Sequence, residues 1–132
     1  MTELILRNAV SEDVPQMAEL EKLCFSDPWS EELIRADVVD NNDISTYILA
    51  QENEEIIGYI GIWTVKDECQ INNVAVHPEH RRKGIGGLLL GTVLAATREA
   101  GITYWTLEVR ESNQTAIKLY QNAGFSIVGT RP

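Results

Sequence analysis

The stretch NVAVHPEHRRKGIGGLLL, from Asn73 to Leu90, joins an apolar strand to an apolar helix through a loop of cations and glycines. Pro78 ends the strand, and a run of three cations precedes Gly84. A helix N-terminus exposes unpaired N–H groups and carries a partial positive charge, so it binds anions. Glycines let the backbone approach a ligand closely. The stretch therefore predicts a binding site for an anion such as a pyrophosphate.

The glycine pattern differs from two common phosphate-binding loops. No Lys-Ser/Thr pair follows the last glycine, which excludes a Walker loop, and the spacing does not fit the dinucleotide fingerprint. What remains is Arg-x-x-Gly-x-Gly, formed by Arg81, Gly84 and Gly86. A helix that simply starts beside surface cations would give the same letters, so the motif alone leaves both interpretations open.

Strand and helix patterns extend outward from this loop in the order β-α-α-β-β-β-α-β-α-β. Strands are expected from Glu3, over 45–51, from Ile56, over 69–76, over 103–109 and over 125–130; helices are expected from Ser11, from Ser30, over 84–100 and over 113–123. Ser11 and Ser30 are the expected N-caps of the first two helices. The three middle strands suggest an antiparallel meander, and two crossovers follow. The order predicts an α/β (α+β) fold with a mixed, mostly antiparallel sheet and helices on both faces.

Composition limits the class of protein. The 132 residues suit one domain over 1–132, and 44% hydrophobic residues predict a full core. The net charge of -9 argues against binding nucleic acid and allows a cationic partner. Cys24 and Cys69 are too few for a disulfide scaffold, and His77 and His80 lack further ligands for a metal. With no signal peptide and no long apolar run, we expect a cytoplasmic protein without a membrane segment and without metal.

Three stretches carry a resemblance to a known family: DPWS (Asp27–Ser30), NVAVHPEHRRKGIG (Asn73–Gly86) and LEVRESNQTAIKLYQNAGF (Leu107–Phe125). Together they resemble the GNAT acetyltransferase superfamily and, within it, the RimI-type enzymes. Those enzymes acetylate the N-terminal alanine of a small-subunit ribosomal protein. The resemblance implies the GNAT fold, acetyl-CoA as co-substrate, and direct attack of the amine in a ternary complex. It also implies a final strand that this sequence does not contain, which should leave an unpaired sheet edge.

The resemblance implies which residues bind acetyl-CoA. Backbone groups of Val74, Ala75 and Val76 would pair with the pantetheine arm, and the Val76 N–H would polarise the thioester carbonyl. The pyrophosphate would lie on the loop that comprises Arg81, Arg82, Lys83, Gly84, Ile85, Gly86 and Gly87. Asn113 is an N-cap candidate by pattern, and the resemblance adds a hydrogen bond to pantetheine.

Glu108 and Tyr120 are the expected catalytic residues. Glu108 alternates with apolar residues on a strand, and a carboxylate in apolar surroundings tends towards a raised pKa and a role as a base. An ordinary carboxylate paired with an arginine would show the same pattern. Tyr120 follows Ile117 on one helix face, which is also typical of a core aromatic. The resemblance implies that Glu108 is the general base and that Tyr120 protonates the leaving thiolate.

The acceptor is expected to be a protein N-terminus. The resemblance implies that the peptide enters beside Phe25, Pro28, Trp29 and Ser30, and the acidic composition would favour a basic ribosomal protein. Trp29 could equally be a packing anchor. Two alternatives remain open: a GNAT enzyme for a small-molecule amine or a lysine side chain, and a non-catalytic acyl-CoA-binding module. The protein is expected to be a monomer or a homodimer.

Overall fold

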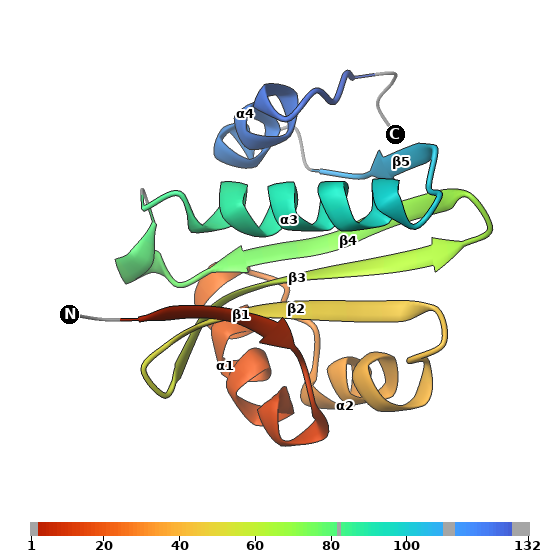
Figure 1. The fold of residues 1–132 in the computed structure, drawn as a ribbon. Helices are drawn as coiled ribbons and strands as arrows, with labels where there is room; N and C mark the ends of the chain where they lie inside the picture. Colours follow the sequence, from red (N-terminus) through yellow and green to blue (C-terminus); the bar gives the residue numbers. More distant parts are fainter. Residues whose placement is uncertain (1–2, 82, 110–112, 128–132) are drawn as a thin grey trace.

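The sheet has five strands in the order β1-β2-β3-β4-β5 and carries helices on both faces (Figure 1). The structure is a computed structural model and describes residues 3–81, 83–109 and 113–127. The strands are β1 (Leu4–Asn8), β2 (Ser45–Glu52), β3 (Glu55–Val65), β4 (Glu68–Val76) and β5 (Tyr104–Leu107); the helices are α1 (Val14–Cys24), α2 (Glu31–Arg35), α3 (Ile85–Glu99) and α4 (Gln114–Asn122). Strands β1 to β4 are antiparallel and β5 is parallel to β4, which confirms the predicted mixed sheet.

Helices α1 and α2 cover one face of the sheet. Met17 of α1 and Ile34 of α2 are buried against Leu49 and Tyr59, because the apolar residues of each helix recur at helical spacing. The predicted N-cap at Ser30 is confirmed, since its hydroxyl accepts the Leu33 N–H at 3.2 Å. The chain continues past α2 as a π-helical turn, 36–40.

Helix α3 covers the opposite face, but not through the side that its small residues suggest. Its buried side chains are Ile85, Leu89, Leu90, Val93 and Thr97, and the first, second and fourth of these form a stripe with a spacing of four residues. The parallel stripe of Gly87, Gly91 and Ala95 is exposed and faces away from the sheet. The small residues of this stripe therefore do not mediate the contact between α3 and the sheet. Both stripes have the same period, and the larger gain from burying branched aliphatic side chains decides which one faces the sheet.

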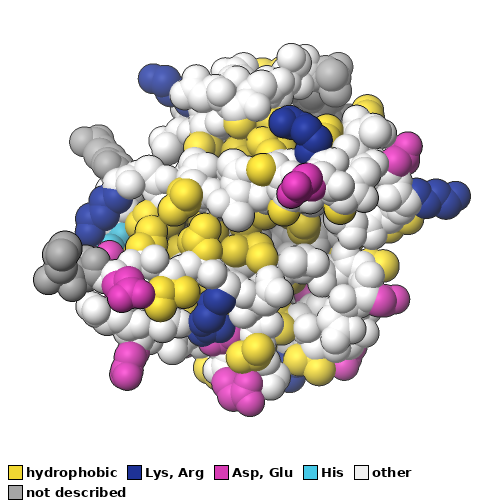
Figure 2. Space-filling view, in the orientation of Figure 1, with side chains coloured by type: hydrophobic (Ala, Val, Ile, Leu, Met, Phe, Trp, Pro, Cys, Tyr) yellow, Lys and Arg dark blue, Asp and Glu magenta, His cyan; other side chains and the backbone are white. Residues whose placement is uncertain are grey.

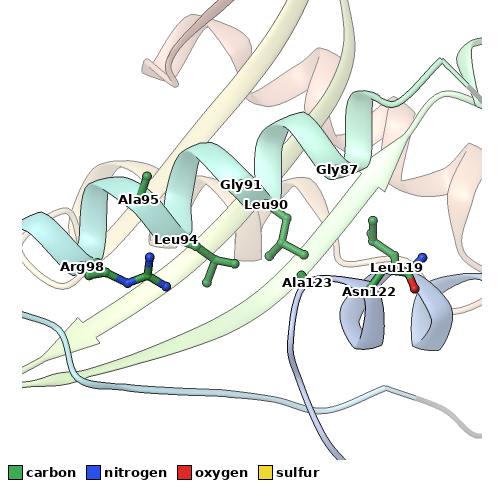
Figure 3. Close-up of a pocket in the computed structure, with 9 residues that line it drawn as sticks. All are labelled: Gly87, Leu90, Gly91, Leu94, Ala95, Arg98, Leu119, Asn122 and Ala123. Carbon is green, nitrogen blue, oxygen red and sulfur yellow. The ribbon is translucent and has the colours of Figure 1, made fainter.

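The small-residue stripe of α3 lines a pocket shared with α4. The pocket has a volume of about 420 Å³. It is lined on one side by Gly87, Leu90, Gly91, Leu94, Ala95 and Arg98 of α3, and on the other by Leu119 and Asn122 of α4 and by Ala123, the C-cap of α4 (Figure 3). In Figure 2, hydrophobic side chains are visible between α4 at the top and α3 below it. Helix α4 thus lies beyond α3 at the margin of the molecule (Figure 1).

Two boundary predictions need correction. Ser11 is not the N-cap of α1: it begins a short 3-10 turn, and the Asp13 carboxylate accepts the Val10 N–H at 2.8 Å instead. The strand expected over 125–130 does not form over its first three residues, and the rest of it lies outside the described residues. No helix in the described part of the chain is both long enough and apolar enough to span a membrane.

Candidate functional site

Strands β4 and β5 pair at one end only. β5 reaches Glu68 to Ile71 of β4, and the described residues form no further pair between the two strands. At the same point the β3–β4 register shifts, so that Asn72 is an extra residue opposite β3. Such a bulge bends a strand and ends pairing locally, and bulges are frequent beside active sites. From Asn73 to Val76, β4 therefore continues with β3 on one side and an open edge on the other, within the described residues.

The backbone groups on this edge follow from the pairing pattern. The His77 N–H donates to the Ile57 carbonyl at 2.8 Å, beside the pair that Gly58 and Val76 form. That bond identifies Gly58/Val76 as a non-hydrogen-bonded pair of the antiparallel ladder. The N–H and C=O of Val76 consequently point away from β3, and those of Val74, two residues earlier, do the same. Val74 and Val76 present hydrogen-bonding groups along the open edge.

Ala75 differs from its two neighbours. It lies opposite Tyr59 as a hydrogen-bonded pair, so its backbone groups face β3 and not the edge. The Val76 carbonyl already accepts two hydrogen bonds at 3.2 Å, from Arg81 Nε and from the Cys24 thiol. Burial raises the pKa of that thiol, which leaves it poorly suited to act as a nucleophile. The Val76 N–H is the backbone group of this residue left for a ligand.

The glycine loop brings the start of α3 close to this edge. Gly84 is the N-cap of α3 and has a φ of +77°, a left-handed conformation that glycine adopts without strain. A Cβ at Gly86 would lie 3.5 Å from Leu119 and 3.7 Å from Val76, so the missing side chain leaves room between these elements. Lys83 Nζ lies 3.3 Å from His80 Nδ1. The first N–H groups of α3 have no partner within the helix and no side-chain cap from Gly84, so they are available to an anion.

Not every predicted loop residue contributes its side chain. Ile85 is 4% exposed and packs in the core, so only its backbone faces the loop. Gly87 lies on the α4 side of α3. Arg82 lies outside the described residues.

Helix α4 carries the predicted Asn113 and Tyr120. Asn113 is confirmed as the N-cap, since its Oδ1 accepts the Ala116 N–H at 3.1 Å. Tyr120 is buried in the core cluster against which Val74 and Val76 also pack. Burial raises the pKa of its hydroxyl to about 12, so it keeps its proton at neutral pH.

Glu108 follows the last residue of β5 and is exposed. Its neighbours Leu107 and Val109 both pack towards the α3 side, which directs Glu108 to the face that α1 and α2 cover. The carboxylate is not enclosed by apolar residues, so the burial argument for a base at this position does not apply. Its assignment as the base rests on the family resemblance and on its face of the sheet.

The predicted peptide-contacting residues lie in the loop between α1 and α2. Phe25 and Trp29 are half-buried against the core cluster that contains Ala75, on the same face as Glu108. Pro28 and Ser30 are exposed, and Ser30 caps α2. Trp29 therefore packs as an anchor, and this loop borders the open edge of β4 from the α1 side.

The sequence did not draw attention to Glu21, which is 1% exposed. Its carboxylate accepts hydrogen bonds from the Tyr59 hydroxyl, from Asn73 Nδ2 at 2.9 Å and from the Trp29 N–H at 3.1 Å. A signal was present: Glu21 follows Val14, Met17 and Ala18 at positions of one helical stripe. A carboxylate on an apolar stripe must find buried donors, and here it finds them beside the open edge.

The arrangement can bind an extended chain with amide groups and a phosphate tail. The edge of β4 offers backbone donors and acceptors, as a sheet edge does for an added strand. These features fit the pantetheine arm and pyrophosphate of acetyl-CoA. Among the described residues, no group of three or more His, Cys, Asp and Glu side chains is placed to hold a metal ion.

Comparison with known proteins identifies related chains. The acetyltransferase (GNAT) family model matches residues 14–125. A ribosomal protein bS18 alanine N-acetyltransferase of Haemophilus influenzae is 35% identical over 121 residues, which are 90% of this chain and 79% of that one. The crystal structure of the ribosomal-protein-S18-alanine N-acetyltransferase from Escherichia coli has a TM-score of 0.87 at 27% identity and covers 94% of this chain and 78% of that one.

A more distant structure shares the fold. The PaiA N-acetyltransferase from Thermoplasma acidophilum, crystallised with coenzyme A, has a TM-score of 0.90 at 19% identity and covers 98% of this chain and 93% of that one.

Proposed function

Because this chain belongs to the GNAT acetyltransferase family, we propose that it transfers the acetyl group of acetyl-CoA to the N-terminal α-amine of a protein. The N-terminal alanine of a small-subunit ribosomal protein is the proposed acceptor. The observation that carries this choice is the 35% identity, over 90% of the chain, to a relative named for that reaction on ribosomal protein bS18. The net charge of -9 supports a basic protein as the acceptor.

The acetyl donor would bind across the open edge of β4 and the start of α3. Val74 would pair with the amides of the pantetheine arm, with Asn113 as a side-chain partner, and the Val76 N–H would be left for the thioester carbonyl. The pyrophosphate would lie against the backbone of 84–87, where Arg81 and Lys83 add positive charge. Ala75 would contribute its side chain and not its backbone.

The chemistry would proceed by direct attack in a ternary complex. Glu108 would accept a proton from the α-ammonium, directly or through a water, which frees the nitrogen lone pair. The Val76 N–H would stabilise the charge that develops on the thioester oxygen. As the new N–C bond forms and the C–S bond breaks, the Tyr120 hydroxyl would donate a hydrogen bond to the leaving thiolate, and the second proton that the nitrogen loses would go to the sulfur. Acetyl peptide and coenzyme A thiol are the products, and no covalent enzyme intermediate is needed.

The peptide would enter on the α1 side of the sheet. Phe25 and Trp29 would flank the first residues of the peptide, with Pro28 and Ser30 at the entrance. An α-amine has an ordinary pKa near 8, against about 10.4 for lysine, so a single carboxylate base deprotonates it more readily. This difference favours a protein N-terminus over a lysine side chain.

The test is acetylation of short peptides, followed by thiol release and by mass spectrometry of the product. The set contains a basic peptide that starts with alanine and the same peptide with a blocked N-terminus and an internal lysine. We expect a single acetyl group on the alanine α-amine and a loss of about 10²-fold or more in kcat for Glu108→Gln. Acetylation of the blocked peptide at an equal rate, or no transfer to either peptide, would refute the proposed function.

A further inference from the structure

Glu21 holds a buried carboxylate that the mechanism above does not use. It lies near the end of α1, is 1% exposed, and takes part in no ion pair within the described part of the chain. An isolated buried charge is costly unless donors surround it. Here the donors are an amide side chain, a hydroxyl and a backbone N–H. Burial and the adjacent carboxylate raise the pKa of the Tyr59 hydroxyl, so it keeps its proton and remains a donor.

The three donors come from separate parts of the molecule. Tyr59 lies on β3 and Asn73 on β4, and both strands are fixed by their ladder hydrogen bonds. Trp29 lies in the α1–α2 loop, outside any helix or strand, and its N–H donates to Glu21 Oε1 at 3.1 Å. The Asn73 amide spans both carboxylate oxygens, at 3.2 Å and 2.9 Å. One side chain therefore joins a loop to a strand at the point where the open edge begins.

We propose that Glu21 is a positioning residue, which fixes the α1–α2 loop against β4 and so sets where the peptide amine meets the thioester. The inference rests on the proposed function, because it assigns the loop to the peptide and the β4 edge to the acetyl donor. Asn73 directly precedes Val74 on that edge, and Trp29 is the residue of the loop that Glu21 binds. Errors of about 1 Å in the approach of two reactants can cost about 10²-fold in rate. The carboxylate touches neither reactant and acts through the two segments it joins.

Asp37 provides a matched control. It is also a buried carboxylate, 4% exposed, on the same face of the sheet. It accepts hydrogen bonds from the Tyr47 hydroxyl at 2.6 Å, the Ser45 hydroxyl at 3.1 Å and Trp63 Nε1 at 3.2 Å. None of these partners belongs to the candidate site. A substitution here removes a comparable buried network without releasing the α1–α2 loop.

The variants are Glu21→Met and Asp37→Leu, which remove every acceptor and keep roughly the same volume. Replacing a buried charge by an apolar side chain of similar size can leave the free energy of unfolding unchanged or raise it. A loss of activity in such a variant can therefore be told apart from a loss of stability. For an alanine-start peptide we expect kcat/KM to fall about 10²-fold in Glu21→Met, through a higher peptide KM and a lower kcat. The dissociation constant of coenzyme A, measured by calorimetry, should stay within about twofold, because the β4 edge keeps its ladder to β3. Asp37→Leu should keep kcat/KM within about threefold.

Asn73→Ala is the second probe and decides the matter if Glu21→Met does not fold. Asn73→Ala should also lower kcat/KM. In the double variant of Glu21→Met and Asn73→Ala, the fold-loss of kcat/KM should be smaller than the product of the two single fold-losses. Equal losses in Glu21→Met and Asp37→Leu would overturn the positioning role, as would unchanged peptide kinetics in Asn73→Ala.

Amide hydrogen exchange separates this inference from the proposed function. Exchange at Trp29 should accelerate at least about tenfold in Glu21→Met and stay near wild type in Asp37→Leu, since only the first loses the acceptor of that N–H. If the wild-type protein acetylates no peptide, the proposed function is wrong, and exchange at Trp29 still tests whether Glu21 holds the loop. Unchanged exchange there would reject the inference even in an active enzyme.

Discussion

Replacing Tyr120 by phenylalanine tests the proposed donor to the leaving thiolate. The substitution removes one hydroxyl and keeps the ring, which packs edge-to-face on Phe125 at 6.0 Å between centroids. Burial raises the pKa of Tyr120 to about 12 from 10.0. At pH 10 an ordinary tyrosine would be half ionised, whereas this hydroxyl would be about 1% ionised. The hydroxyl should therefore keep its proton and act as a donor between pH 6 and pH 10.

The size of the effect follows from the role. A single donor aimed at charge that develops in the transition state contributes about 10²–10³ in kcat. Tyr120→Phe should lose about that factor, while the affinity for coenzyme A changes little because the ring packing remains. The raised pKa also means that the hydroxyl stabilises the thiolate chiefly by hydrogen bonding, since it is a weaker acid than a thiol, whose ordinary pKa is about 8.5.

The assay is thiol release at saturating substrates from pH 6 to pH 10, in wild type and in Tyr120→Phe. The two pH profiles should run parallel, separated by a constant factor of about 10²–10³. A loss below about threefold would mean that Tyr120 is not the donor. A decline in the wild type with an apparent pKa near 10 that disappears in Tyr120→Phe would show that the hydroxyl ionises normally, and the burial reasoning would fail.

Three further predictions concern stability. The Arg7 guanidinium, 2.7 Å from the Asp13 carboxylate, holds the pKa of Asp13 below its usual range. Asp13→Asn should therefore lower the free energy of unfolding by about 1–2 kcal/mol at pH 7. Urea unfolding should show this difference between variant and wild type shrink as the pH falls below about 4. Gly61→Ala would put a Cβ in steric conflict with the Tyr47 ring, whose hydroxyl donates to Asp37 at 2.6 Å, so thermal unfolding should show a loss of about 1–3 kcal/mol. Asn113→Ala should cost about 1 kcal/mol through the lost α4 cap, and amide exchange should rise in the first turn of α4 but not of α3.

Local signals in the sequence predicted much of the fold. Ser30 and Asn113 precede helices and cap them as expected, since a cap depends on residues three positions away. Gly84 is needed where the chain turns into α3 with a positive φ. The meander of β2, β3 and β4 followed from short polar turns between apolar strands. Each of these features is decided within a few residues of the chain.

Other features depend on segments that are distant in sequence. Ala75 resembles Val74 and Val76 in the sequence, and only the pairing with β3 shows that its backbone faces the other way. Glu21 could be found on an apolar stripe, but its partners at Tyr59 and Asn73 are 38 and 52 residues away. The exposure of Glu108 likewise depends on where β5 ends. Tertiary pairing, and not local propensity, decides these positions.

The extra residue at Asn72 has a consequence for the parity of β4. Before it, the odd-numbered Cys69 and Ile71 face the α3 side; after it, the even-numbered Val74 and Val76 do. The bulge absorbs this extra residue, so the parity of the residue numbers changes while the alternation of side chains relative to β3 continues. Deleting Asn72 would therefore leave Asn73 and Val76 facing as they do and would remove only the bulge, so that a straighter β4 could pair further along β5 and close the edge proposed for the acetyl donor.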